Sequence, residues 1–187
     1  MQTFLIATGA VALAEIGDKT QLLSLILAAR YRRPWPICAG ILLATLVNHA
    51  MAGALGELLA SWLTPALLHW VVVASLAAMA LWMLVPDRMD DDEAHTGGVH
   101  SVLLATAMAF FLAEMGDKTQ VATVVLAAQY HPLWQVVAGT TAGMLLANVP
   151  VVWLGSRFAG RLPLKATRVA AAALFAILAV WIAANAV

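Results

Sequence analysis

The chain has 187 residues, of which 63% are hydrophobic and 11% are charged, and its formal net charge is zero. A soluble domain is about half apolar and about a quarter charged, so this composition indicates an integral membrane protein and excludes an ordinary soluble enzyme. No basic patch with interleaved aromatic residues occurs in the sequence, which excludes a nucleic-acid-binding surface. The single cysteine, Cys38, excludes an intrachain disulfide framework and any site built from several cysteine ligands.

Six segments of the chain are long and apolar enough to span a bilayer, which takes about 20 residues of helix. Tryptophan residues cluster near the ends of these segments, as is typical of the two membrane interfaces. The sequence therefore predicts an all-α integral membrane protein with six transmembrane helices. In chain order the segments cover residues 4–29, 35–59, 66–85, 101–128, 133–155 and 166–186.

An acidic linker, residues 86–100, divides the chain into two halves, residues 1–85 and 101–187. A run of acidic residues is most often a solvated connection, although it also attracts cations. The halves are repeats, because a shift of 99 residues aligns residues 13–56 with residues 112–155 without a gap. We therefore expect two three-helix units joined by the linker.

The two units are expected to have opposite orientations in the membrane. Each holds three predicted helices, an odd number, so the second unit enters from the side opposite to the first. Outside the repeated motif described below, the basic residues follow the first, third and fifth predicted helices. By the positive-inside rule the loops after these helices are cytoplasmic, so both termini lie outside the cytoplasm. Two inverted repeats are the architecture of many secondary transporters. The basic residues counted here are Arg30, Arg32, Arg33, Arg88, Arg157, Arg161, Lys165 and Arg168.

One string, Glu-x-Gly-Asp-Lys-Thr-Gln, occurs in each half, at residues 15–21 and 114–120. Both copies lie inside long apolar segments, the first and the fourth predicted helices. At a rise of ~1.5 Å per residue, Glu15 and Glu114 fall near the middle of the membrane. Ionisable side chains at that depth are candidates for function by default.

The spacing within the motif indicates a cation site. Glu15 and Asp18 are at positions i and i+3, so a continuous helix would present both carboxylates on one face, which Gln21 extends. Gly17 and Gly116 weaken the helix, so we expect the first and fourth helices to be broken near them. Carboxylate, amide and backbone carbonyl oxygens suit hard divalent cations such as Ca²⁺, Mg²⁺ or Mn²⁺.

The charge of the two motifs favours exchange of a cation for protons. Together they contain four carboxylates and two lysines, a formal charge of −2, which one divalent cation or two protons neutralise. Left unpaired, six such charges would cost on the order of 15–20 kcal/mol in the membrane. Burial also favours the protonated form of a carboxyl group. We therefore predict that a divalent cation and protons compete for one site.

Some roles stay open at this stage. A buried ion-pair lattice that only holds the helices together is the alternative to a transport site. Lys19 and Lys118 are either counter-ions of the empty site, or side chains that snorkel or pair across the repeat. Asn48 and His49 fall near the middle of the second predicted helix, and Asn148 aligns with His49. His49 is a candidate soft ligand that would favour Mn²⁺ over Ca²⁺, a candidate proton carrier, or a hydrogen-bonded packing residue.

The doubled motif closely resembles the signature E-x-G-D-[KR]-[ST] of a family of small cation exporters, which includes the bacterial MneA-type manganese exporters and Golgi and plastid Mn²⁺/Ca²⁺ transporters. The resemblance covers nearly the whole chain, and no motif position departs from the pattern. It implies export of Mn²⁺, with Ca²⁺ as the alternative, in exchange for H⁺. The metal site that it implies consists of Glu15, Asp18, Glu114 and Asp117, with Thr20, Gln21, Thr119 and Gln120 beside them.

The predicted function is that of a secondary transporter, not an enzyme, located in the bacterial inner membrane. No cofactor is expected, since the metal is cargo and protons are the coupling ion; the expected partners are the lipid bilayer and divalent metal cations, and the oligomeric state is left open. A Ca²⁺ or broad divalent-cation antiporter is the first alternative, and a passive cation channel is the second. An intramembrane hydrolase fits poorly, since a symmetric pair of lysine-containing motifs has no use in cleaving one bond.

Overall fold

The computed structural model describes residues 1–85, 101–155 and 164–185, and within these ranges the chain forms eight helices and no strand. The predicted linker, residues 86–100, lies outside the described residues. So do three of the basic residues used for the orientation argument, Arg88, Arg157 and Arg161. The helices are α1 (Gln2–Glu15), α2 (Lys19–Tyr31), α3 (Pro34–Trp62), α4 (Pro65–Trp82), α5 (Val102–Glu114), α6 (Lys118–Gln129), α7 (Leu133–Leu154) and α9 (Leu164–Ala184).

Four of the helices, α3, α4, α7 and α9, are long and apolar enough to cross a membrane. Each coincides with a predicted segment to within a few residues. Proline accounts for the start of α3 and of α4, because Pro34 and Pro65 occupy the first helical turn, where a missing N–H costs nothing. Thr64 caps α4 by accepting a hydrogen bond from the N–H of Leu67 at 3.4 Å. The all-helical, membrane-protein character expected from the composition is therefore confirmed.

The first and fourth predicted segments are each two shorter helices. Residues 4–29 correspond to α1 and α2, and residues 101–128 correspond to α5 and α6. In both cases the chain leaves the helix after the motif glutamate and resumes it at the motif lysine. α1 and α5 are apolar but only 14 and 13 residues long. The helix breaks therefore lie at the motif glycines, where the sequence predicted them.

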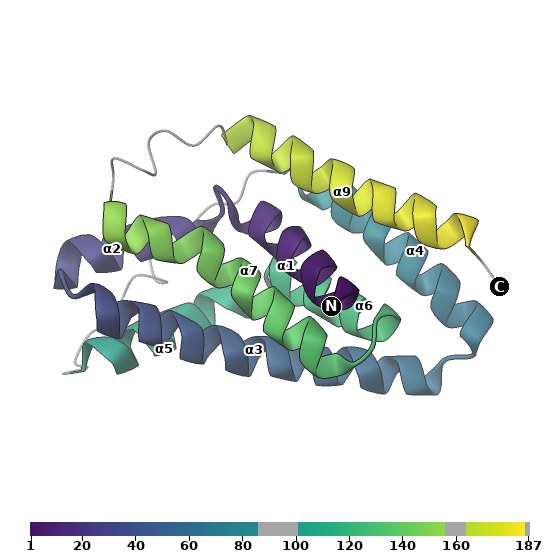
Figure 1. Ribbon diagram of the computed structural model, residues 1–187, viewed down its shortest axis with the longest axis horizontal. Coiled ribbons are helices and arrows are strands. Elements are labelled where there is room, and N and C mark those ends of the chain that lie inside the picture. Colours follow the sequence, from purple (N-terminus) through teal and green to yellow (C-terminus); the bar gives the residue numbers. More distant parts are fainter. Residues whose placement is uncertain (86–100, 156–163, 186–187) are drawn as a thin grey trace.

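The helices pack in two groups (Figure 1). α4 and α9 lie side by side, and α9 contacts α1 while α4 contacts α6. The other group contains α3 and α7, with α5 packed against α3 and α1 packed against α7. One buried apolar cluster joins α4 and α9 to α1 and α6, and a second one joins α2, α3, α5 and α7. The two broken segments therefore contact both groups.

Close helix contacts recur at equivalent places in the two halves. A Cβ atom added at Gly40 would lie 2.8 Å from the carbonyl oxygen of Leu103, and one added at Gly139 would lie 2.6 Å from that of Phe4. Both distances are too short for a real Cβ, so only glycine permits this approach. Gly40 and Gly139 are 99 residues apart, and so are Phe4 and Leu103. The α3–α5 contact is therefore the counterpart of the α7–α1 contact.

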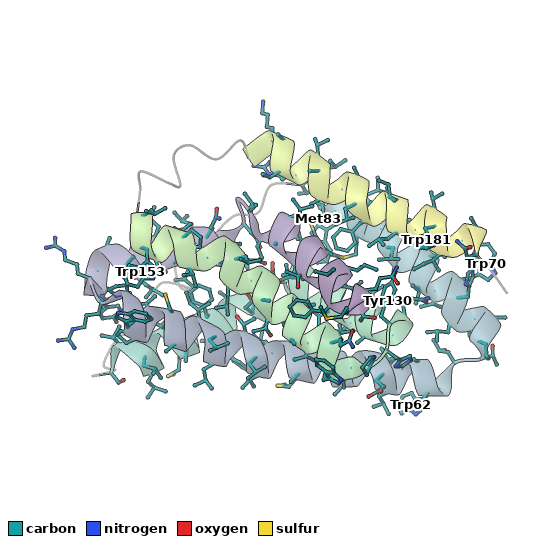
Figure 2. The ribbon with its side chains drawn as sticks, in the orientation of Figure 1. Trp62, Trp70, Met83, Tyr130, Trp153 and Trp181 are labelled. Carbon is teal, nitrogen blue, oxygen red and sulfur yellow. The ribbon has the colours of Figure 1, made fainter. Side chains whose placement is uncertain are left out.

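Tryptophan side chains lie on the outside of the molecule and toward its two ends. In Figure 2, Trp153 lies toward one end, and Trp62 and Trp70 lie toward the other. Trp62 is 73% exposed and Trp70 is 59% exposed. Large exposed indole rings suit the boundary between hydrocarbon and water, where one edge of the ring is apolar and its N–H is hydrated. The positions of these residues fit a molecule whose long axis crosses the membrane.

Candidate cation site

The first motif leaves the helix through a tight turn. α1 ends at Glu15, and Ile16 follows with φ −66° and ψ 110°, then Gly17 with φ +88°. These values are those of a type II β-turn, whose third residue needs a positive φ and is therefore usually glycine. The turn is closed by a hydrogen bond from the N–H of Asp18 to the carbonyl oxygen of Glu15 at 3.1 Å. Asp18 then occupies the N-cap position of α2.

The second motif repeats this geometry. Met115 has φ −64° and ψ 120°, and Gly116 has φ +74°. The N–H of Asp117 donates to the carbonyl oxygen of Glu114 at 3.1 Å, and Asp117 is the N-cap of α6. The expectation that glutamate and aspartate share one face of a continuous helix was wrong, because the helix ends between them. In the first motif the turn brings the carboxylates of Glu15 and Asp18 close together instead.

The motif glutamines brace the two turns. Gln21 Oε1 accepts a hydrogen bond from the N–H of Gly17 at 3.0 Å, and Gln120 Oε1 accepts one from the N–H of Gly116 at 2.7 Å. Each bond satisfies a backbone donor that the broken helix leaves exposed. The oxygens that sequence reasoning assigned to the metal therefore already hold the turns, which is a role that the sequence alone did not indicate.

The amide nitrogens of the same glutamines reach the other half of the chain. Gln21 Nε2 donates to the carbonyl oxygen of Ala147 on α7 at 3.0 Å. Gln120 Nε2 is 3.5 Å from Asn48 Oδ1 on α3, and Asn48 Nδ2 donates to the carbonyl oxygen of Phe111 at 3.1 Å. Asn48 therefore supports the second turn from the opposite half.

Three motif carboxylates converge in the interior. Glu15, Asp18 and Asp117 each offer one oxygen, and these three oxygens lie within 4.8 Å of one another. The three residues are 0%, 6% and 4% exposed. Buried like charges at this distance repel strongly, so a bound cation would stabilise the group. This cluster, Glu15–Asp18–Asp117, is called the carboxylate cluster below.

Hydroxyl and amide groups orient the carboxylates. Thr20 Oγ1 donates a short hydrogen bond to Glu15 Oε2, and Asn148 Nδ2 lies 3.5 Å from the same oxygen. Thr119 Oγ1 donates to Asp117 Oδ2 at 3.2 Å. The two motif threonines therefore bind carboxylate oxygens. In the described part of the chain, the second oxygen of Glu15 makes no hydrogen bond.

Glu114, the fourth predicted carboxylate, lies next to His49. It is fully buried, and His49 Nε2 is 3.5 Å from Glu114 Oε2. Glu114 also lies close enough to Glu15 for their charges to repel, and close enough to Lys19 for attraction. Lys19 therefore lies near the carboxylate of the other half, an arrangement compatible with a counter-ion as well as with pairing across the repeat.

Lys118 likewise reaches across to the first half. It is only 3% exposed, its amino group donates to the carbonyl oxygen of Val85 at 2.7 Å, and its nitrogen lies 6.0 Å from the centre of the Trp82 ring. Lys118 and Arg168 also line a narrow crevice that contains Asp18. The crevice thus brings two cationic side chains beside an acidic residue of the carboxylate cluster.

Sequence reasoning missed the contribution of α9 to this region. Thr167 Oγ1 donates to the carbonyl oxygen of Ile16 within the first turn, at 3.2 Å. Arg168 was counted only as a loop charge, yet it lies in the first turns of α9 and lines the crevice. The third helices of the two halves match only weakly in sequence, so the repeat gave no indication of these contacts.

Comparison with known proteins identifies the family of the chain. The family model described as "Divalent cation/proton antiporter GDT1" matches residues 3–91 and 102–187. A protein of Vibrio cholerae described as a "Putative manganese exporter" is 52% identical over 180 residues, which cover 96% of this chain and 89% of that protein. A GDT1-like protein of Synechocystis is 26% identical, with 91% of each chain covered.

A third relative, GDT1-like protein 5 of Arabidopsis thaliana, is 27% identical over 194 residues, which cover 81% of this chain and 82% of the relative. No solved structure matches the chain. The resemblance carried by the doubled motif is confirmed, because the family model extends over both halves and both turns. The chain therefore belongs to the GDT1 family of divalent cation/proton antiporters.

Proposed function

We propose that this protein exports divalent cations, with Mn²⁺ as its main cargo, in exchange for protons. The observation that carries the proposal is the carboxylate cluster, in which Glu15, Asp18 and Asp117 place three buried oxygens within 4.8 Å of one another. Oxygen ligands at this separation suit a divalent cation of the size of Mn²⁺ or Ca²⁺. The family description and the manganese-exporter relative support cation export.

The charge balance supports antiport over simple diffusion through a pore. Lys19 lies close enough to Glu114 for attraction, and Lys118 lines the same crevice as Asp18. With all motif groups ionised, the formal charge of the site is −2. One divalent cation neutralises this charge, and so do two protons. Binding of the cation therefore displaces the protons, and binding of the protons displaces the cation. A pore that conducts cations passively has no need of this equivalence.

We further propose that the two halves form an inverted repeat of three transmembrane helices each, with both termini outside the cytoplasm. Several contacts support this arrangement, since each has a counterpart 99 residues away in the other half. Glu15 faces Asn148 while Glu114 faces His49. A site at the centre of such a repeat can be reached from either side by a rocking motion of one half against the other.

Transport into proteoliposomes tests the proposal. We expect the purified protein to move Mn²⁺ when a pH gradient is imposed and to move protons in the opposite direction. The double variant Glu15→Gln/Glu114→Gln keeps the shape of both side chains and removes two charges, so its Mn²⁺ flux is expected to fall at least 100-fold. Mn²⁺ flux that ignores the pH gradient would indicate a channel, and normal flux in the double variant would exclude the proposed site.

A parallel measurement with Ca²⁺ and Mg²⁺ defines the cargo. Faster flux of Ca²⁺ than of Mn²⁺ under the same gradient would make the protein a calcium exporter with the same mechanism. The variant Glu57→Gln is a suitable control, because Glu57 is an exposed carboxylate of α3 outside the site. Its flux is expected to equal that of the wild type.

A further inference from the structure

The two halves of the site differ in one chemically important respect. The motifs are identical except at Ile16 and Met115, which are both apolar. The side chain that faces each motif glutamate from the other half is different, however. It is an amide, Asn148, opposite Glu15, and an imidazole, His49, opposite Glu114.

The amide is fully engaged by its surroundings. Asn148 Oδ1 accepts a hydrogen bond from Ser24 Oγ at 2.7 Å. Asn148 Nδ2 donates to the carbonyl oxygen of Met144 at 3.1 Å and also approaches Glu15. Both polar atoms of the Asn148 side chain make hydrogen bonds, which is typical of a residue with a structural role. We therefore assign Asn148 the role of orienting Glu15.

The imidazole is in the opposite situation. His49 is completely buried, yet within the described ranges neither of its ring nitrogens makes a hydrogen bond. The same is true of both carboxylate oxygens of Glu114, which is also completely buried. Buried polar atoms in proteins nearly always have a partner. Four such atoms on two neighbouring side chains indicate that a bound species supplies the missing contacts.

The separation of the two side chains fits a shared cation better than a hydrogen bond. His49 Nε2 and Glu114 Oε2 are 3.5 Å apart, which is longer than the usual N–H···O distance of about 2.9 Å. A metal ion bound to both at about 2.1–2.3 Å would make a ligand–metal–ligand angle of about 100–113°. That angle lies within the range of ordinary coordination geometries.

We propose that His49 and Glu114 bind the transported cation together, and that the nitrogen of His49 selects Mn²⁺ and other transition metals over Ca²⁺ and Mg²⁺. Imidazole is a good ligand for first-row transition metals, whereas Ca²⁺ and Mg²⁺ strongly prefer oxygen. The carboxylate cluster binds hard cations with little discrimination, and the His49–Glu114 pair adds the discrimination. This inference rests on the proposed function and names the cargo of that same site.

Pulsed EPR of bound Mn²⁺ tests the ligand directly. The full-length wild-type protein, purified and loaded with Mn²⁺ alone, is expected to show the ¹⁴N modulation of a coordinated imidazole. Labelling the histidines with ¹⁵N should change the modulation to that of ¹⁵N, and His49→Asn should abolish it. His69→Asn is the matched control, since His69 lies in a different cavity beside Gln129 and Asn185, and it should leave the signal unchanged.

The possible failures are distinguishable. Bound Mn²⁺ without nitrogen modulation in the wild type would overturn this inference and leave the proposed export of cations standing. Modulation that persists in His49→Asn would assign the nitrogen to another residue and would also overturn it. A wild-type protein that binds no Mn²⁺ would overturn both the inference and the proposed function.

Competition between cations gives a second, independent readout. His49→Asn substitutes the residue that the other half carries at the equivalent position, and His49→Gln places an amide near the position of Nε2. In both variants the ratio of the Mn²⁺ affinity to the Ca²⁺ affinity is expected to fall about tenfold or more, as measured by displacement titration. Changes around a bound metal commonly alter its affinity by this amount. An unchanged ratio in a variant that still melts cooperatively and binds Ca²⁺ would contradict the assignment.

Discussion

Neutralising one member of the carboxylate cluster should make the metal-free protein more stable and weaken its metal binding. The variant Asp117→Asn keeps the size of the side chain and removes one negative charge. Asp117 shares its cluster with Glu15 and Asp18, with the three ligand oxygens within 4.8 Å of one another. At that distance and an effective dielectric constant of ~20, each pair of ionised groups repels by about 3.5 kcal/mol.

The size of the effect follows from the number of pairs. Asp117 takes part in two of the three pairs, so its neutralisation removes about 7 kcal/mol of repulsion when all three groups are ionised, and less where neighbouring cationic side chains offset it. About 1 kcal/mol raises the melting temperature of a chain of this size by roughly 2–4 °C. We therefore expect the metal-free variant to melt several degrees above the wild type. Residues that are kept for activity often behave in this way: their replacement raises the stability of the protein and lowers its function.

The response to metal should change in the opposite direction. A ligand present at about 100 times its dissociation constant stabilises the folded state by about 2.7 kcal/mol. If Asp117→Asn weakens Mn²⁺ binding about 100-fold, the stabilisation at the same concentration falls to about 0.4 kcal/mol. Thermal melting of both proteins with and without Mn²⁺ measures this difference, with Glu57→Gln as the control. A variant that is less stable without metal, and that gains as much from Mn²⁺ as the wild type, would refute the assignment of the cluster as the cation site.

Four further substitutions test individual contacts. Gly17→Ala and Gly116→Ala force a side chain into a positive φ, so each should lower the free energy of unfolding by about 1–2 kcal/mol and reduce Mn²⁺ flux, as measured by denaturation and by uptake. Lys118→Met removes the donor to a carbonyl at the end of α4, so flux should fall while Mn²⁺ affinity, measured by titration, is retained. Gly139→Ala should lower the melting temperature because its Cβ would meet a backbone oxygen at 2.6 Å, whereas Gly9→Ala, with nothing within 4 Å, should not. Equal melting temperatures for the last two would show that the α7–α1 contact tolerates a side chain.

The sequence predicted the helices well because the signal for each one is local. Apolar length determines a span, and the four long helices begin and end within a few residues of their predicted bounds. The glycine in each charged motif likewise predicted a break, and in both motifs the helix ends just before it. The repeat then identified Asn148 as the counterpart of His49, and both lie against motif glutamates.

The contacts that the sequence did not predict depend on packing between distant segments. Nothing local to Gln21 shows that its oxygen will brace Gly17 and not a metal, because that choice depends on the turn closing first. The hydrogen bond from Thr167 to Ile16 and the position of Arg168 depend on how α9 lies against α1. These are tertiary relationships, and a single sequence carries no periodic signal for them.

The crossed contacts at the centre explain why the motif occurs twice. A single copy would hold its own turn through glutamine and glycine, but its carboxylates would lack their partners. Asn148 orients Glu15 from the second half, and Lys19 of the first half acts on Glu114 of the second. Because each half completes the electrostatic environment of the other, a movement of one half against the other changes both half-sites at once. Under the proposed mechanism, charge neutralisation by a cation or by protons would be felt across the interface, which is the coupling that antiport requires.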